Sequence, residues 1–379
     1  MSRLGGEVKP RVASVDALRG LIMIIMALDH VRDFFHSAAM KFQPDDLTRT
    51  TTAIFLTRWI THFCAPVFVF TAGTAAYFLL QRGRTRGQVS RFLWTRGLWL
   101  VFLELTVVRF GLLLAGAPGV FILEVIWVLG VSMIILAALI HLPLRLLTML
   151  SLATIALHNL ADPITGGGLW NIVHVQGGFK LGSLFVVAAY PLVPWFAVMA
   201  AGFCFGHLFE LDEPTRRTLF TRIGLGLTAA FLALRFLNIY GNLTPWNGSA
   251  LSFLNCTKYP PSLDFLLMTL GPAILLLGWL ERPPALLLTV GRVPLFYFIV
   301  HLYLIHALAK VAVAMQLGRT DLLYSLAPSM ALPDRPAEYG FHLWVVYLVW
   351  IAVVAMLYPL CRWFGELKQR RTDWWLSYL

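Results

Sequence analysis

The sequence is poor in charged residues. Of its 379 residues only 13% are Asp, Glu, Lys or Arg, whereas 59% are hydrophobic and the mean hydropathy is +0.74. Soluble domains average about 25% charged and about 45–50% apolar residues. The composition therefore excludes a disordered chain, a coiled coil and a nucleic-acid-binding module, and it predicts an integral membrane protein.

Cysteine is scarce as well. The four cysteines form no C-x-x-C pair and have no spacing typical of a metal site. The chain also lacks an H-E-x-x-H motif, a P-loop and a G-x-S-x-G motif. His301 and His306 are five residues apart, so they lie on different faces of a helix and do not form an i,i+4 metal-binding pair. We therefore expect no metal.

Long apolar stretches are abundant. A helix needs about 20 mostly apolar residues to cross the hydrocarbon core of a bilayer. Windows of roughly that length predict an all-α, polytopic bundle of about ten transmembrane helices, which forms a single domain over residues 1–379. The ten windows are 14–35, 56–80, 97–114, 120–141, 146–161, 184–208, 223–240, 262–280, 293–316 and 342–361.

Basic residues are divided unevenly between the two sides of this bundle. With the N-terminus in the cytoplasm, 18 of the 30 Lys and Arg residues fall in inner segments, 8 in outer loops and the remaining four within spans. Cytoplasmic loops are enriched in Lys and Arg, so both termini are predicted to be cytoplasmic, with a leader at 1–13 and a tail at 362–379. Most of the net charge of +11 is then an orientation signal, and we expect no nucleic-acid partner.

The first predicted span concentrates polar residues, each of which costs about 2.5–3.5 kcal/mol at the middle of a span. Asp16, Arg19, Met23, Met26 and His30 recur at helical spacing, so they share one face of the helix. Arg19 and His30 are 11 residues apart, which corresponds to about 16 Å along the helix axis. Arg19 is therefore expected near the cytoplasmic surface and His30 near the outer side.

This spacing suits a long anionic donor that is held at one end and reacts at the other. The planar guanidinium of Arg19 is a good phosphate ligand. A neutral imidazole at His30 can accept a proton from an attacking hydroxyl or amine, with Asp29 or Asp33 to orient it. A purely structural interpretation stays open, in which Arg19 extends to the lipid headgroups and His30 lies at the outer interface.

Several sequence blocks resemble one known family. They are RVASVDALRGLIMIIMALDHVRDFF at the start, then APVFVFTAGTAAYFLLQRG, AAYPLVPWFAVMAAGFCFG, KYPPSLDFLLMTLGP, GRVPLFYFIVHLYLIH and the ending RRTDWWLSYL. Together these blocks are similar to the bacterial branch of the heparan-alpha-glucosaminide N-acetyltransferase-like proteins, which belong to the wider group of transmembrane acyltransferases.

The resemblance implies a multi-helix bundle that takes an acyl group, usually acetyl from acetyl-CoA, on the cytoplasmic side and passes it to a sugar hydroxyl or amine on the outer side. Related bacterial carbohydrate O-acetyltransferases carry a basic residue, ten intervening positions and a histidine in an early span, and Arg19 and His30 match that pattern. These relatives also use paired arginines near the inner end of another span. Arg91 and Arg96 are the nearest equivalents here.

The resemblance leaves two candidates for the catalytic histidine. In the lysosomal enzyme the essential histidine follows an aromatic pair, and here His36 follows Phe34-Phe35. We favour His30 as the catalytic residue, with Asp29 assisting it, and keep His36 as the second candidate.

We therefore predict a multi-pass acyltransferase of the plasma (inner) membrane that moves an acyl group from cytoplasmic acyl-CoA to a carbohydrate or other small acceptor. The expected partners are the lipid bilayer, acyl-CoA and this acceptor, and homo-oligomerisation is left open. An alternative is a transporter or flippase whose polar residues line a solute path. The predicted donor-binding residues are Arg19, Arg91 and Arg96, and the candidates on the acceptor side are Asp33, His174, Lys258 and His301.

Overall fold

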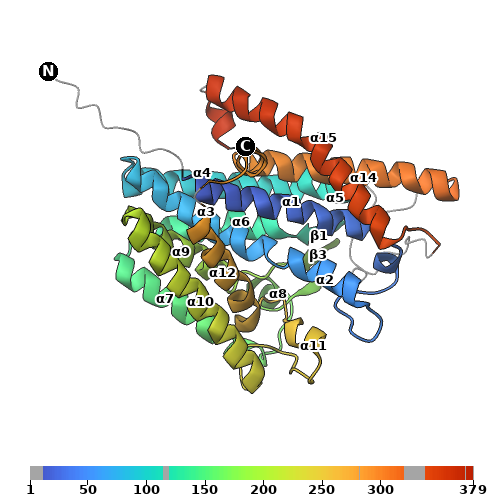
Figure 1. The fold of residues 1–379 in the computed structure, drawn as a ribbon, viewed down its shortest axis with the longest axis horizontal. Coiled ribbons are helices and arrows are strands. Elements are labelled where there is room, and N and C mark those ends of the chain that lie inside the picture. Colours follow the sequence, from blue (N-terminus) through green and yellow to red (C-terminus); the bar gives the residue numbers. More distant parts are fainter. Residues whose placement is uncertain (1–11, 114–118, 281, 320–337, 372, 379) are drawn as a thin grey trace.

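The computed structural model describes residues 12–113, 119–280, 282–319, 338–371 and 373–378, most of which are helical. Figure 1 shows long helices running side by side along the longest axis of the molecule. Apart from its last two residues, the predicted leader 1–13 lies outside the described residues.

Every predicted window contains at least part of a helix. In chain order the main helices are α1 (Ala13–Phe35), α2 (Thr52–Thr61), α3 (Cys64–Gln81), α4 (Arg86–Leu103), α5 (Arg109–Leu113), α6 (Val125–Leu139), α7 (Leu144–Leu157), α9 (Trp195–Phe205), α10 (Glu213–Leu237), α12 (Leu263–Trp279), α14 (Pro294–Leu317) and α15 (Leu343–Arg370). A π-helical turn at Glu104–Val108 joins α4 to α5. Three short helices complete this set: α8 (Leu169–Val173), α11 (Ala250–Leu254) and α13 (Ala285–Gly291).

Five helical stretches of the described chain are long and apolar enough to cross a membrane. Three further helices are apolar but shorter, and α1 has 23 residues but carries several charges. The prediction of a mostly helical protein is thus confirmed, the five stretches support a multi-pass membrane protein, and the number of ten crossings stays a prediction. The five stretches are Thr52–Gln81, Leu144–Ala161, Glu213–Leu237, Pro294–Leu317 and Leu343–Arg370.

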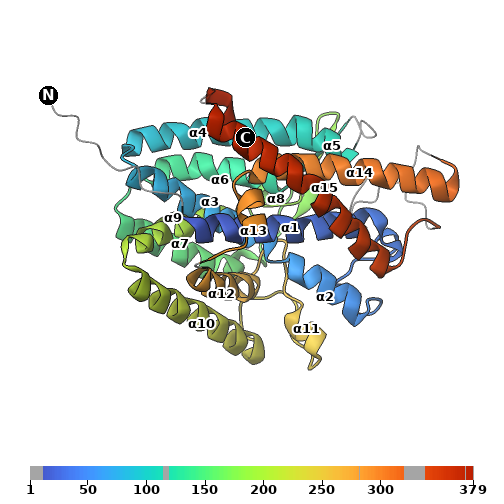
Figure 2. The ribbon, with the colours of Figure 1, turned by 45° about the horizontal axis from the view of Figure 1, so that its top comes forward.

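Helix α1 lies at the centre of the molecule and packs against α3, α13, α14 and α15 (Figures 1 and 2). Its contact with α13 requires glycine on both sides. A Cβ atom on Gly20 would overlap the carbonyl oxygen of Leu287, and one on Gly291 would overlap that of Asp16. Because glycine has no Cβ, the two backbones can touch here. This contact fixes the first turns of α1 relative to α13.

The other helices pack in pairs around this centre. Helix α3 packs on α9, α4 on α6, α7 on α9 and α10 on α12. The outermost helices keep large apolar side chains exposed, such as Phe236 on α10 and Ile351 and Trp363 on α15. Exposed apolar bands of this kind are expected where helices face lipid instead of water.

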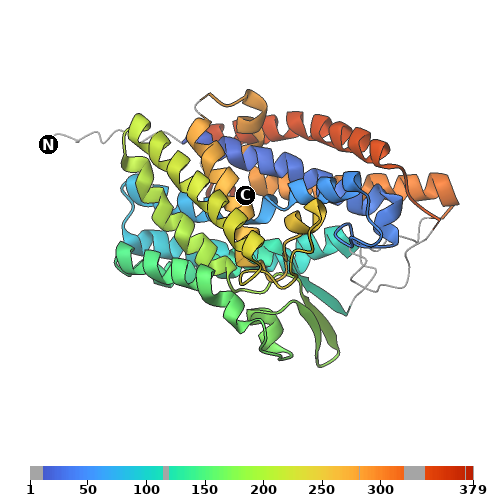
Figure 3. The same cartoon turned by 60° about the horizontal axis from the view of Figure 1, so that its bottom comes forward.

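The prediction of an all-α fold is wrong in one region, where three short strands form a sheet in the order β1-β3-β2. Strand β1 (Val120–Leu123) pairs in parallel with β3 (Leu184–Ala188), and β2 (Gly177–Leu181) pairs with β3 in antiparallel fashion. Figure 3 shows the β2–β3 hairpin at the lower edge of the molecule. The two-residue loop 182–183 begins with Gly182 at a φ of 61°, which is a hairpin signal that hydropathy windows do not register.

The segment 241–261 is folded against the end of α10 by Arg235. The guanidinium of this fully buried arginine donates to the carbonyl oxygens of Thr244 (2.7 Å) and Phe253 (2.9 Å), among others. A buried charge of this kind is tolerated because backbone oxygens surround it. It fixes the loop that carries Lys258 and Tyr259.

Candidate active site

Two cavities lie along the polar face of α1. The first, here called the Arg19 cavity, encloses about 250 Å³ between α1, α3, α4, α6 and the start of α14. The second, the His30 cavity, encloses about 280 Å³ between α1, α2, the start of α6, α14 and the segments around Tyr190 and Lys258.

The linings of the two cavities come within one helical turn of each other on two helices. Along α14, Leu295 lines the Arg19 cavity and Phe298 lines the His30 cavity. These residues are less than one helical turn apart, or about 4.5 Å along the axis. Along α6 the neighbours Ile126 and Val125 line the Arg19 and His30 cavities, respectively. The two cavities are therefore neighbours along α6 and α14.

Arg19 is held in place by helix α3. Its Nε donates to Thr71 Oγ1 at 3.2 Å, and one of its terminal nitrogens donates to the carbonyl oxygen of the same residue. A second terminal nitrogen lies 3.8 Å from Asp16 Oδ1 on α1. The guanidinium is thus fixed at the wall of its cavity.

The Arg19 cavity is strongly basic. Asp16 is its one acidic lining residue within the described part of the chain. The remaining basic lining residues come from four different elements and are Arg82, Arg96, Arg292 and Lys368. An excess of positive charge in a cleft with apolar walls favours the binding of a polyanion.

Arg91 is not brought to this cavity. It is exposed on α4, whereas Arg96 lines the cavity. Five residues along an α-helix correspond to a rotation of about 140°, so these two arginines face different directions. Of the three predicted donor-binding residues, the structure therefore groups Arg19 and Arg96 and leaves Arg91 at the surface.

In the His30 cavity, Asp29 is the centre of an ion-pair network. Its Oδ2 accepts a hydrogen bond from Arg58 (2.6 Å) and its Oδ1 accepts one from Thr61 Oγ1 (2.9 Å), while Arg32 forms an ion pair with Oδ1 at 2.8 Å. Arg58 and Thr61 belong to α2, so this network ties α2 to the end of α1. If one member of this largely buried network is removed, the charge of its partner is left unpaired in a poorly solvated environment.

His30 lies beside this network but is not part of it. In the described structure its Nδ1 is buried without a hydrogen-bond partner, and Asp33 pairs with Arg32 at 2.6 Å. The imidazole ring packs instead against His301, with 5.1 Å between the ring centroids, and against Phe298 at 6.5 Å. The expected carboxylate partner of His30 is therefore absent among the described residues.

The structure adds polar residues to the His30 cavity that sequence reasoning missed. Glu124 lines it from the start of α6, and Tyr190 and Tyr259 line it from separate segments. Lys258 was predicted, and its Nζ lies 5.1 Å from the Tyr259 ring and 5.9 Å from the Tyr190 ring. The sequence signal for Tyr190 and Tyr259 was their place in the blocks AAYPLVPW and KYPPSLDF, and Glu124 lies outside these blocks.

Two predicted residues lie away from this cavity. His36 directly follows α1, and its backbone pairs with Phe341. Burial, reinforced by the nearby charge of Arg32, lowers the pKa of His36 to about 4. His174 lies at the end of α8 and contacts Asp162 instead. The structure thus groups Asp29, His30, Asp33 and Lys258, with His301 behind His30.

A comparison with protein families decides the identity. The family model described as heparan-alpha-glucosaminide N-acetyltransferase, catalytic, matches residues 11–243, which is more than half of the chain. The chain belongs to this family. No curated protein matches it.

The family consists of acetyl-CoA-dependent N-acetyltransferases, so the chain is a membrane acetyltransferase with acetyl-CoA as its donor. The matched region includes Arg19, Arg96, His30 and the α2 residues that bind Asp29. The segment around Lys258 and the whole of α14 lie beyond it. The family resemblance inferred from the sequence blocks is confirmed.

Proposed function

We propose that acetyl-CoA binds in the Arg19 cavity from the cytoplasm and that its acetyl group is transferred in the His30 cavity to a hydroxyl or amine of a carbohydrate on the outer side. The observation that carries this proposal is the arrangement of the two cavities along one face of α1, with linings that come within one helical turn of each other on α6 and α14.

The donor site follows from charge. Acetyl-CoA carries its phosphates at one end and its thioester at the other, on an arm without charge. Arg19 and Arg96 would bind the phosphates through charge-assisted hydrogen bonds. The arm would then pass between Leu295 and Phe298 toward His30. Arg19 and His30 are separated by about 16 Å along the axis of α1, which suits a donor that is bound at one end and reacts at the other.

The chemistry is the transfer of an acetyl group from the sulfur of CoA to an oxygen or nitrogen of the acceptor. The acceptor oxygen or nitrogen attacks the thioester carbonyl, and the imidazole of His30 accepts the proton that it loses. The new C–O or C–N bond forms as the C–S bond breaks, and the thiolate of CoA takes up the proton. Lys258 lines the same cavity, and its cation would stabilise the negative charge that develops on the carbonyl oxygen.

The lining of the His30 cavity supports a polar acceptor with several hydrogen-bonding groups. The carboxylates of Asp33 and Glu124 line this cavity together with the rings of Tyr190 and Tyr259. Carbohydrates present both hydroxyl groups and apolar ring faces, which match such a mixed lining. A few well-placed polar groups in an otherwise apolar pocket are typical of small-molecule sites.

A reconstituted enzyme tests transfer across the membrane. The protein is inserted into sealed liposomes with radiolabelled acetyl-CoA on one side and an amino sugar on the other. We expect labelled acetyl-sugar on the side opposite to the donor, together with release of CoA. Product found only on the donor side would contradict transfer between the two cavities.

The orientation of the chain in the inner membrane, with both termini in the cytoplasm, needs a separate experiment. The four native cysteines are buried, and they are replaced by alanine before Asp45→Cys or Thr85→Cys is introduced. In intact cells an impermeant thiol reagent should label position 45 and leave position 85 unlabelled, because most basic residues lie on the side of position 85. The reverse pattern would overturn the orientation.

A further inference from the structure

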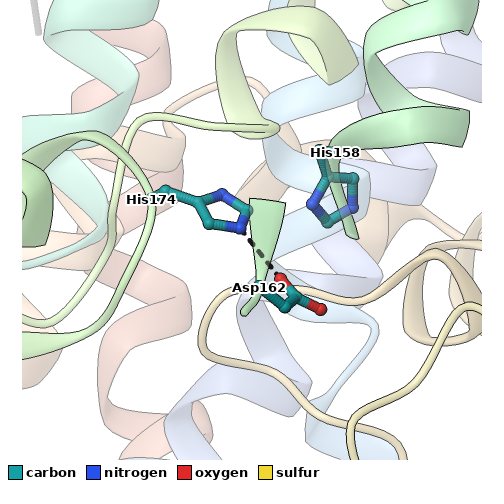
Figure 4. A group of neighbouring side chains, drawn as sticks. All are labelled: His158, Asp162 and His174. Carbon is teal, nitrogen blue, oxygen red and sulfur yellow. Dashed lines mark hydrogen bonds and ion pairs between the residues drawn. The ribbon is translucent and has the colours of Figure 1, made fainter. Parts of the chain in front are cut away.

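A cluster of three metal-binding side chains lies outside both cavities. His158 stands at the end of α7, Asp162 follows one turn later, and His174 ends α8. Their potential ligand atoms all lie within 4.8 Å of one another, and His174 Nε2 is 2.8 Å from Asp162 Oδ1. Figure 4 shows the three side chains converging from different segments on one point.

Both histidines of this cluster are buried, and some of their ring nitrogens have no hydrogen-bond partner in the described structure. His158 is only 6% exposed, and neither of its ring nitrogens has a hydrogen-bond partner in the described structure. His174 is 1% exposed, and its Nδ1 also lacks a partner there. An unsatisfied buried polar group costs about 1–3 kcal/mol, so each case needs an explanation.

We propose that His158, Asp162 and His174 bind one divalent transition-metal ion, with Zn²⁺ as the ion that best fits these donors. Two imidazoles and a carboxylate are a common zinc ligand set, with bonds of about 2.0–2.2 Å. Tetrahedral geometry at that length places the ligand atoms about 3.3 Å apart. The cluster spans this separation, so rotation of the side chains is enough to form the site. Water completes the fourth position.

The surroundings of Asp162 support this assignment. Asn159 Nδ2 donates to Asp162 Oδ2 at 2.8 Å and leaves Oδ1 directed at the histidines. Hydrogen bonds of this kind orient the ligands of many metal sites. Asn159 Oδ1 in turn accepts from the backbone N–H of Leu263 at 2.9 Å, so the site is anchored to the start of α12.

The metal would act as a structural cross-link. The backbone of α8 accepts hydrogen bonds from Leu192 (2.9 Å) and Val193 (2.8 Å), close to Tyr190 of the His30 cavity. A metal bound between α7 and α8 would therefore fix the segment that carries Tyr190. This proposal departs from the expectation of no metal. In the sequence, Asp162 follows His158 by four residues and His174 follows Asp162 by twelve.

Metal content and affinity test the proposal directly. The full-length protein is purified in detergent, its affinity tag is removed, and it is treated with chelator and then with Zn²⁺. We expect one equivalent of zinc after desalting, measured by mass spectrometry of the metal. Cobalt in place of zinc should give the visible absorption of a tetrahedral site.

Matched variants separate this site from adventitious binding. Asp162→Asn keeps the shape and the contact with His174 but should weaken zinc affinity by at least about 10-fold, and His158→Ala should do so by about 100-fold or more. His141→Ala, at an exposed histidine, should leave affinity unchanged. Zinc should raise the melting temperature of the wild type and of His141→Ala only. Less than a tenth of an equivalent in the wild type, or equal affinity in wild type and Asp162→Asn, would overturn the proposal.

Discussion

The Arg19 and His30 cavities are similar in size but opposite in their use of charge. Among the described residues, the lining of the Arg19 cavity has one carboxylate, Asp16, against five cations, so it is strongly positive. The His30 cavity has four carboxylates, Asp29, Asp33, Asp45 and Glu124, against the cations Arg32, Arg58 and Lys258. The described lining of the Arg19 cavity thus carries a net positive charge, whereas in the His30 cavity Asp29 and Asp33 form ion pairs with Arg32 and Arg58.

This difference in charge suggests different roles: the charges of the Arg19 cavity bind a ligand, whereas many of those in the His30 cavity hold helices in position. In the Arg19 cavity the guanidinium of Arg19 donates to the side chain and the carbonyl oxygen of Thr71 and lies 3.8 Å from Asp16 Oδ1. In the His30 cavity Asp29 is saturated by Arg32 and Arg58, so it fixes helices and not a ligand. Substitutions in the two cavities should therefore affect different measured quantities.

The largest effect is expected at His30. A general base contributes about 10²–10⁴-fold, so His30→Asn should lower kcat by that factor and leave the KM for acetyl-CoA within a few-fold. The measurement is a steady-state assay in nanodiscs. The matched control is His36→Asn, because His36 lies outside the cavity. Loss of kcat in His36→Asn with activity retained in His30→Asn would move the catalytic role to His36.

A large effect on stability is expected at Arg58. Arg58→Met leaves Asp29 partly uncompensated among buried groups, and breaking a buried ion pair costs about 3–5 kcal/mol of unfolding free energy. Unfolding is followed by tryptophan fluorescence in a denaturing detergent. Arg49→Met, at an exposed arginine, should change this free energy by less than about 0.5 kcal/mol. Equal stability of the two variants would show that the Asp29 network does not hold α2.

A smaller effect, confined to donor binding, is expected at Arg19. Charge-assisted contacts to phosphate contribute about 1.5–3 kcal/mol, so Arg19→Ala should weaken acetyl-CoA binding about 10-fold or more. Calorimetry on the purified protein measures this, with CoA itself as the ligand. Arg91→Ala serves as the control and should bind normally. If Arg91→Ala instead weakens binding as much as Arg19→Ala, the donor lies along the surface of α4.

The smallest effect concerns pH and His36. Its pKa is lowered to about 4 by burial, whereas in the unfolded chain it lies near 6.5. The unfolded state therefore binds the proton first, so stability falls as the pH decreases from about 6.5 to 4 and is unaffected by His36 above that range. We expect His36→Gln to reduce this part of the fall in melting temperature. An unchanged slope in the variant would assign the fall to other groups.

Local patterns explain which parts of the fold and site were predictable. The length of apolar windows placed a helix in all ten of them, and the 11-residue spacing placed Arg19 and His30 on one face of α1. Both features depend on neighbours within the same helix. The β2–β3 hairpin was missed because Leu184–Ala188 is apolar in either a helix or a strand, and only its pairing with β1 makes it a strand.

The same distinction between local patterns and long-range contacts applies to the site. Arg58, Tyr190 and Lys258 come from segments far apart in the chain, and no spacing relates them to His30. Arg292 reaches the Arg19 cavity because α13 packs on α1 at Gly20 and Gly291. The sequence placed Lys258 on the acceptor side with His30, but it did not bring Arg58 or Tyr190 to that site or Arg292 to the donor site.

By itself the sequence determined that this protein is a helical membrane protein, which face of its first helix is polar and to which family it belongs. These properties follow from composition, from the 3.6-residue period and from blocks of adjacent residues. The tertiary structure alone decided that this polar face borders two cavities, that Asp29 pairs with Arg58 and not with His30, and that His158, Asp162 and His174 converge. Such groupings depend on how helices pack over long chain separations, and helix packing is set by the shapes of whole surfaces instead of by local spacing.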